Sequence, residues 1–83
     1  MLLNIITPDK KVFEGEVISS TFPGSNGSFE VLKDHAPIIS SLEEGNVKVK
    51  KASGEIENFV VSGGIVEVLD NKITLLAEGV VTA

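Results

Sequence analysis

His35 is the only histidine in the sequence, and Asp34 precedes it directly. A histidine that a carboxylate orients could act as a general base. Neighbouring residues of an extended chain point to opposite sides, however, so adjacency in sequence does not place Asp34 against the ring. Ser40 and Ser41 lie nearby, but nothing in the sequence gives these hydroxyls a base in triad geometry. We therefore interpret His35 as a loop histidine that bonds locally or contacts a partner, and we expect no catalytic residue.

Metal and cofactor sites are poorly supported. One histidine and no cysteine cannot assemble an ordinary zinc site, and adjacent Glu43 and Glu44 fit a solvated turn better than a ligand set. The loop Pro23–Ser28 consists of small residues but lacks the lysine of a phosphate-binding loop. It could be a plain hairpin loop, or it could contact a partner through exposed backbone. The glycine pair after Ser62 predicts a bulge, a tight bend or the close approach of another backbone. We expect neither a metal nor a cofactor.

The charge balance narrows the possible partners. The sequence has 12 acidic residues against 7 basic ones, all lysine, and a net charge of −5. Binding to nucleic acid or to an anionic lipid surface is disfavoured, because both rely on clustered positive charge. No apolar stretch approaches the ~20 residues of a spanning helix, and the N-terminus does not resemble a signal peptide. We expect a cytoplasmic protein, peripheral to a membrane at most, with one domain over residues 1–83.

The elements that would position these residues are short strands. Turn-forming residues, Gly15 among them, recur after every few positions, which is typical of a sandwich or barrel. Residues 46–51 and 55–61 flank Ser53-Gly54 and predict one hairpin, and residues 65–69 and 72–77 flank Asp70-Asn71 and predict another. We predict an all-β fold, a flattened antiparallel β-sandwich of about ten short strands in two sheets.

The alternation of apolar residues predicts which side chains fill the space between the sheets. The predicted core consists of Leu3, Ile5, Val12, Val17, Phe29, Val31, Ile39, Val47, Val49, Phe59, Val61, Ile65, Val68, Ile73 and Leu75.

Several segments together resemble one family. Asp34–Ile39 and the following Leu42–Gly45 resemble a Gly-His-Ala-Pro-Leu-Leu segment and its Pro-Gly turn, with Asp34 in place of glycine and Glu44 in place of proline. Phe59–Val68 is similar to a Ser-Gly-Gly-hydrophobic-x-Glu-Val segment. Val12–Val17 resembles the Phe-x-Gly-x-Val start of the same family, and Ile73–Ala77 resembles its penultimate strand. The family is the epsilon subunit of F-type ATP synthase, called delta in mitochondria. The resemblance extends over nearly the whole chain.

The resemblance implies a non-catalytic rotor subunit at the foot of the central stalk. Such a subunit binds the gamma subunit and rests on the membrane-embedded c-ring, and so couples proton or sodium ion flow to ATP synthesis. It would lie at the cytoplasmic face of the inner (plasma) membrane without insertion. The segment that matches the family's c-ring contact comprises Gly24, Ser25, Asn26, Gly27 and Ser28. The segments that match its gamma contact comprise His35, Ala36, Pro37, Ile38 and Ile39, with Ser62, Gly63 and Gly64.

The family also has a C-terminal helical hairpin, which has no counterpart up to Ala83, so we expect no helix-based inhibition from these residues. Two alternatives remain. Lipoyl and biotinyl carriers are also acidic β-sandwiches, and they need a modifiable lysine at a hairpin tip; Lys72 adjoins the Asp70-Asn71 turn but lacks a carrier-like flanking pattern. A small enzyme dependent on His35 is the other alternative.

Overall fold

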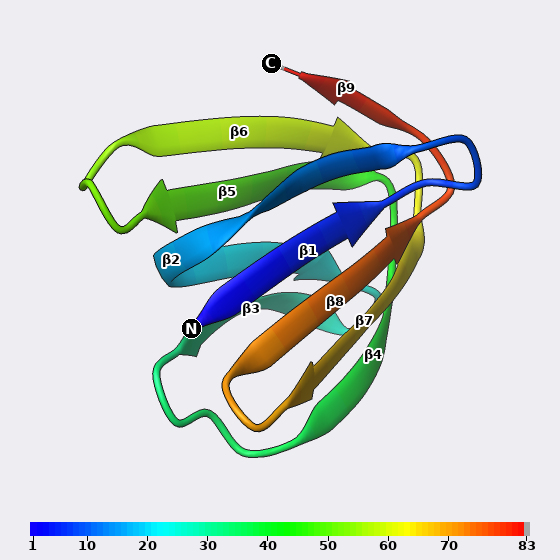
Figure 1. Cartoon of the computed structure of the whole chain (residues 1–83). Helices are drawn as coiled ribbons and strands as arrows, with labels where there is room; N and C mark the ends of the chain where they lie inside the picture. Colours follow the sequence, from blue (N-terminus) through cyan, green and yellow to red (C-terminus); the bar gives the residue numbers. More distant parts are fainter. Residues whose placement is uncertain (83) are drawn as a thin grey trace.

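The computed structural model describes residues 1–82, and all of its regular elements are strands. Their bounds are β1 (Leu2–Ile6), β2 (Lys11–Gly24), β3 (Gly27–Leu32), β4 (Ile38–Leu42), β5 (Gly45–Lys51), β6 (Ile56–Val61), β7 (Gly64–Leu69), β8 (Lys72–Ala77) and β9 (Val80–Thr82). Residues 1–82 contain no helix that could span a membrane. The all-β prediction is confirmed, and Figure 1 shows the strands wrapped around one interior.

The long strand β2 shapes the fold because it takes part in both layers of the sandwich. Its first part, up to Glu16, pairs with β1, and its second part pairs with β5 and β3. The register against β5 shifts between Val17 and Ser19, which leaves Ile18 as an extra residue. Such a bulge bends a strand and increases its twist. Figure 1 shows β2 curving from one layer into the other.

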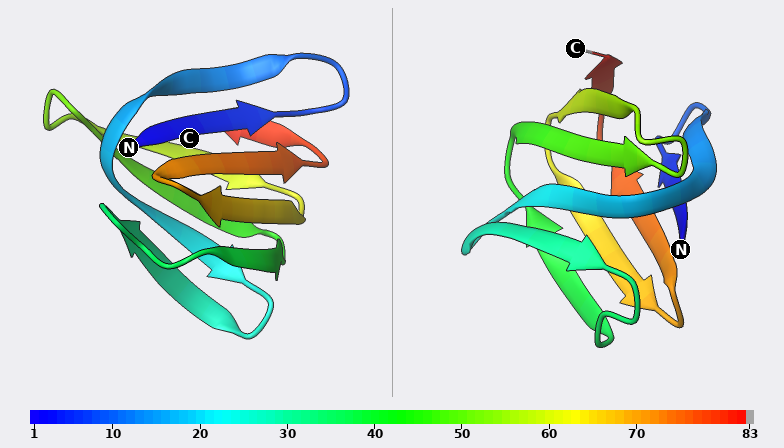
Figure 2. Two further views of the ribbon diagram at one scale, coloured as in Figure 1. Left: turned by 60° about the horizontal axis from the view of Figure 1, so that its bottom comes forward. Right: turned by 90° about the vertical axis from the view of Figure 1, so that its left-hand side faces the viewer.

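Two layers face each other across the core (Figure 2). One layer holds β1, β8, β7 and β4 beside the first part of β2, and the other holds β3, β5, β6 and β9 beside the second part. Because β2 contributes one segment to each layer, the two layers together contain the predicted number of about ten short strands. One strand pair departs from the antiparallel prediction, because β1 runs parallel to β8. The direction of β1 is set by its antiparallel hairpin with β2, and β1 then pairs with the edge of β8 that β7 leaves free.

The space between the layers is filled by aliphatic and aromatic side chains, as predicted. The predicted core residues that are buried are Leu3, Ile5, Val17, Val31, Val47, Val49, Phe59, Val61, Val68, Ile73 and Leu75. Val12 and Phe29 are half-buried and pack against them. The prediction missed Phe22, Leu42, Val66 and Ala77, which are also buried.

Two predicted core residues are on the outside. Ile39 is 73% exposed and Ile65 is 50% exposed. Side chains alternate along a strand, so Ile65 cannot share a face with Val68, three residues on, and the buried neighbour is Val66. In β4 the inward positions are those of Ile38 and Leu42, which leaves Ile39 on the outer face.

Two local predictions also differ from the structure. Gly15 is predicted as a turn but lies inside β2 opposite Leu3, where the Phe13 ring covers it. The strand β9 is not predicted, because three residues are too few for an alternating pattern.

An aromatic contact joins the two layers. The ring centroids of Phe13 and Phe59 are 5.8 Å apart, and the rings are tilted by 65° in an edge-to-face arrangement. Phe13 comes from the part of β2 that pairs with β1, whereas Phe59 belongs to β6 in the opposite layer. The contact therefore helps hold the layers together, as edge-to-face pairs do.

Candidate docking surfaces

The tip of the β2–β3 hairpin is exposed but firmly held. Gly24 pairs with Gly27 across a two-residue turn, and the residues from Ser25 to Ser28 are exposed. The Ser25 N–H donates to the carbonyl of Ser41 at 3.0 Å, and the Ser41 Oγ lies 3.0 Å from Ser25 Oγ. The predicted c-ring contact is therefore a loop of small residues tied to β4.

Gly24 has no room for a side chain. A Cβ there would lie 2.6 Å from the carbonyl oxygen of Gly27 and 2.9 Å from the Phe29 ring. The backbone N–H of Glu43 donates to the Pro23 carbonyl at 3.0 Å and closes the other side of the tip. These contacts define the shape of the tip, and the sequence alone indicates only the glycines.

The loop between β3 and β4 carries His35, and a contact with Asn71 shapes it. Asp34 has a left-handed backbone, with φ 64°, which explains why glycine suits this position. The Asp34 N–H donates to Asn71 Oδ1 at 2.7 Å, and the Asn71 amide donates to Asp34 Oδ1 at 3.0 Å. The Asp34 carboxylate thus binds Asn71. The His35 Nδ1 lies 2.7 Å from the Ala36 carbonyl oxygen, so the local bonding predicted for this histidine is confirmed.

Ser62-Gly63-Gly64 connects β6 to β7 at a point where backbones meet closely. A Cβ on Gly64 would lie 2.4 Å from the carbonyl oxygen of Leu76 on β8. Both glycines have positive φ, 139° for Gly63 and 155° for Gly64. The predicted close approach of another backbone is therefore confirmed.

The structure separates the two groups of predicted gamma-contact residues. Gly64 pairs with Leu42, next to the β2–β3 tip, so Ser62–Gly64 lies at the same end of the sandwich as the predicted c-ring contact. The loop His35–Pro37 lies at the opposite end, beside the β7–β8 turn (Figure 1). The six residues of β7 span about 17 Å between these ends.

The outer face of the layer β1, β8, β7 and β4 is unusually apolar. Its exposed side chains include Ile39, Ile65, Leu69 and Leu76, each about half exposed or more. They are neighbours by register, since Ile65 lies opposite Leu76 and Leu76 lies beside Ile6. We call Ile6, Ile39, Ile65, Leu69 and Leu76 the apolar face. Exposed apolar patches of this kind commonly mark interaction sites.

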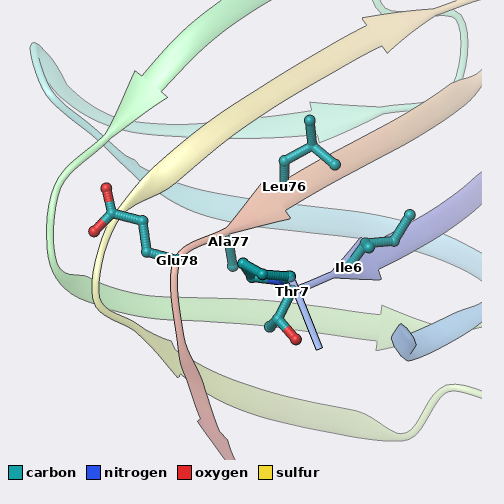
Figure 3. Close-up of a pocket in the computed structure, with 6 residues that line it drawn as sticks. Ile6, Thr7, Leu76, Ala77 and Glu78 are labelled. Carbon is teal, nitrogen blue, oxygen red and sulfur yellow. The ribbon is translucent and has the colours of Figure 1, made fainter. Parts of the chain in front are cut away.

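Two hollows border the apolar face. The first has a volume of about 390 Å³ and is lined by Ile6, Thr7, Pro8, Leu76, Ala77 and Glu78. Figure 3 shows Ile6 and Leu76 projecting side by side from their two strands. The second has a volume of about 360 Å³ and is lined by Pro37, Ile38, Ile39, Glu67, Val68 and Leu69. Both are shallow and apolar, with one carboxylate each.

Ion pairs are few in the described residues. Lys11 Nζ donates to Glu14 Oε1 at 2.7 Å, and this hydrogen bond holds the pKa of the Glu14 carboxyl below its usual value. Lys51 Nζ lies 2.9 Å from Glu57 Oε1, and that hydrogen bond raises the pKa of Lys51. No group of three or more potential metal ligands is found within residues 1–82.

Comparison with known proteins decides the family. A family model described as the beta-sandwich domain of the ATP synthase delta/epsilon chain matches residues 1–83. The chain belongs to this family. The epsilon-type resemblance is thereby confirmed, and the match covers the predicted site segments as well as the core strands. Lys72, the lysine considered for a lipoyl or biotinyl carrier, pairs with Leu69 at the turn end of the β7–β8 ladder.

Relatives in the delta/epsilon family share both sequence and fold with the chain. The ATP synthase epsilon chain of Chlorobaculum tepidum is 44% identical over 78 residues, which are 94% of this chain and 89% of that protein. A chain of the Euglena gracilis mitochondrial ATP synthase, in a structure of its OSCP, F1 and c-ring, superimposes with a TM-score of 0.92 at 24% identity over 99% of this chain. A chain of the Tetrahymena thermophila central stalk and c-ring gives 0.79 at 23% identity over 98%. The match spans 52% and 65% of those two chains, and it shows the fold.

Proposed function

We propose that the chain is a non-catalytic rotor subunit of an F-type ATP synthase that docks on the gamma subunit and the c-ring. It would lie at the cytoplasmic face of the membrane and couple proton or sodium ion flow to ATP synthesis. Family membership supports this proposal. The fold supports it too, since the two superimposed chains come from assemblies that include a c-ring.

The observation that carries the proposal is the anchored tip of the β2–β3 hairpin. A coupling subunit must transmit force, so its contact with the ring has to be stiff, and packed, hydrogen-bonded backbone is stiff. Ser25 is tied to Ser41 by two hydrogen bonds, and Glu43 is tied to Pro23. The exposed residues of the tip are small, so another backbone could approach closely. We assign the c-ring contact to Gly24–Ser28 on these grounds.

The gamma contact is assigned to His35–Ile39 and Ser62–Gly64. Ile39 is the most exposed large apolar residue among those described, and it lies on the apolar face. Gly64 leads directly into Ile65 on the same face. A subunit that spanned the face from one end of β7 to the other would touch both segments. Burial of this face would also stabilise a domain as small as this one, so gamma should raise its thermal midpoint.

Replacement of Ser25 and Ser28 by glutamate tests the c-ring contact. If the tip meets the ring, the bulky acids should prevent the rotor from assembling, measured as retention of the chain on purified c-ring with gamma. Ser53→Glu is the matched control, because Ser53 is an exposed serine in the β5–β6 turn at the other end of the sandwich. Unchanged assembly and coupling in the tip variant would exclude Gly24–Ser28 from the interface.

A further inference from the structure

Glu67 occupies the centre of the apolar face. On its own strand β7 the flanking outward residues are Ile65 and Leu69. Across β4 its partner is Ile39, and across β8 its partner is Thr74. Three of the four nearest outward side chains are therefore large and aliphatic. A single carboxylate stands in the middle of a surface that is otherwise suited to burial.

No cation neutralises Glu67 within the described part of the chain. The ion pairs there join Lys11 to Glu14, Lys51 to Glu57, and the N-terminus to Glu16. Lys72 is the cation on the same face. It lies opposite Leu69, whereas Glu67 lies opposite Thr74. Its charge also contributes, less than that of Lys11, to lowering the pKa of Glu14. Glu67 is thus free to accept a partner from outside the molecule.

A purely apolar partner would fit this surface badly. Covering the aliphatic side chains would also remove Glu67 from water, and burial of a carboxylate without a counter-charge is strongly unfavourable. An apolar partner surface with one cation at its centre would avoid that cost and gain a charge-assisted hydrogen bond. We propose that the surface docking on the apolar face carries an arginine or lysine, set among aliphatic side chains, that pairs with Glu67. This inference rests on the proposed function, which makes that surface part of gamma.

The hollow beside Glu67 supports the same pairing. Pro37, Ile39 and Leu69 line it, and Glu67 forms part of its wall. Its volume of about 360 Å³ is large enough for an aliphatic side chain together with the carbon stem of an arginine or lysine. Such stems commonly pack on apolar surface while their charged ends reach an acid. The Asp34–Asn71 hydrogen bonds hold the loop that carries Pro37, so the hollow is formed before the partner arrives.

Replacement of Glu67 by leucine distinguishes a cationic partner from an apolar one. With a cation opposite, Glu67→Leu leaves that cation buried and unpaired, and the dissociation constant for the cognate gamma subunit should rise about 30-fold or more. Glu67→Gln should weaken binding less, because its amide oxygen still accepts a hydrogen bond. Titration calorimetry with the chain and purified gamma measures both constants. Glu30→Leu is the control, since Glu30 is also exposed but lies on β3 in the other layer, and the dissociation constant of this variant for gamma should not change.

The outcomes separate this inference from the proposed function. If wild-type chain binds gamma and Glu67→Leu binds equally or more tightly, the partner has no cation at this point and the inference is wrong while the function stands. If wild-type chain does not bind gamma, the proposed function fails. If sedimentation shows instead a dimer of the chain that Glu67→Leu tightens, the face joins two copies and the inference is wrong. Circular dichroism melting of each variant shows that it is folded.

Discussion

Asp34 and Asn71 hold each other through two hydrogen bonds although 37 residues separate them in the sequence. Asn71 accepts from the Asp34 backbone and donates to its carboxylate. Both residues have left-handed backbones, with φ 64° and 60°. Asn71 also fixes the start of β1, since its carbonyl accepts from the Leu2 N–H at 3.0 Å. One asparagine therefore joins the β7–β8 turn to the His35 loop and to the N-terminal strand.

This arrangement predicts that Asn71→Gly lowers the free energy of unfolding by about 1 kcal/mol more than Asp70→Gly. Glycine tolerates the backbone conformation at both turn positions, but no hydrogen bond from the Asp70 side chain is found in the described structure. Urea denaturation at pH 7 measures both values. Equal losses would show that the Asn71 amide adds nothing to stability.

A second substitution tests whether the two residues act as a pair. Asp34→Gly relieves the left-handed strain but removes one hydrogen bond, so this substitution alone should change the free energy of unfolding by close to zero. In the Asp34→Gly background, Asn71→Gly should lower the free energy of unfolding by less than it does in the wild-type chain, because the hydrogen bond from Asn71 to the Asp34 carboxylate is already absent. Strictly additive losses would contradict the pairing.

The sequence predicts the local parts of this fold and misses the contacts between distant segments. The Asp70-Asn71 and Ser53-Gly54 hairpins are predicted because turn residues and flanking strands are adjacent in sequence. The Asn71 contact with Asp34 depends on how β3, β7 and β8 meet, which no local pattern encodes. Ile39 is misplaced because the adjacent Ile38-Ile39 and Ser40-Ser41 leave the phase of alternation undetermined. Ile65 is misplaced although Glu67, two residues on, indicates that their shared face is the outer one.

The candidate site shows the same division. The small residues of this segment predict a loop, and the family resemblance implies that Gly24–Ser28 contacts the c-ring. The anchor of the loop on Ser41, 16 residues away from Ser25, is not predicted. The position of Glu67 among aliphatic side chains depends on the registers of two strand pairs. Residue types indicate that a surface exists, whereas its composition follows from the pairing of strands.

Ser20 provides a prediction about the core. It is fully buried in β2, and its Oγ has no hydrogen-bond partner in the described structure. A buried hydroxyl without a partner costs about 1–3 kcal/mol, so Ser20→Ala should raise the free energy of unfolding by about 1 kcal/mol. Ser19→Ala is the neighbouring control, because Ser19 is only half-buried. Thermal and urea denaturation measure the change, and a destabilised Ser20→Ala would show that the hydroxyl is satisfied in solution.

Glu14 provides a prediction about pH. The Lys11 hydrogen bond holds the folded-state pKa of Glu14 below the unfolded value. The stabilisation is therefore fully present above the unfolded pKa and is lost as pH falls through the lowered folded pKa. Lys11→Ala should move the Glu14 titration midpoint upward, measured by carbon-detected NMR of the side-chain carboxyl. High salt should reduce the difference, since both groups are exposed. A midpoint that does not move would show that the pair does not persist in solution.

Gly64 provides the sharpest steric prediction. A Cβ at this position would lie 2.4 Å from the Leu76 carbonyl oxygen and 3.0 Å from the Ala77 Cα, both backbone atoms that cannot turn aside. Gly54 also has positive φ, at 94°, but nothing lies within 4 Å of its Cβ position. Gly54→Ala should therefore cost only the backbone strain of about 1–2 kcal/mol. Gly64→Ala adds the collision, and we expect the free energy of unfolding to fall by about 3 kcal/mol or more.

For so small a domain the loss from Gly64→Ala approaches its whole stability, so unfolding should be measured at 10 °C with gamma absent and present. Equal losses for the two alanines would mean that β7 and β8 can separate at this point without cost.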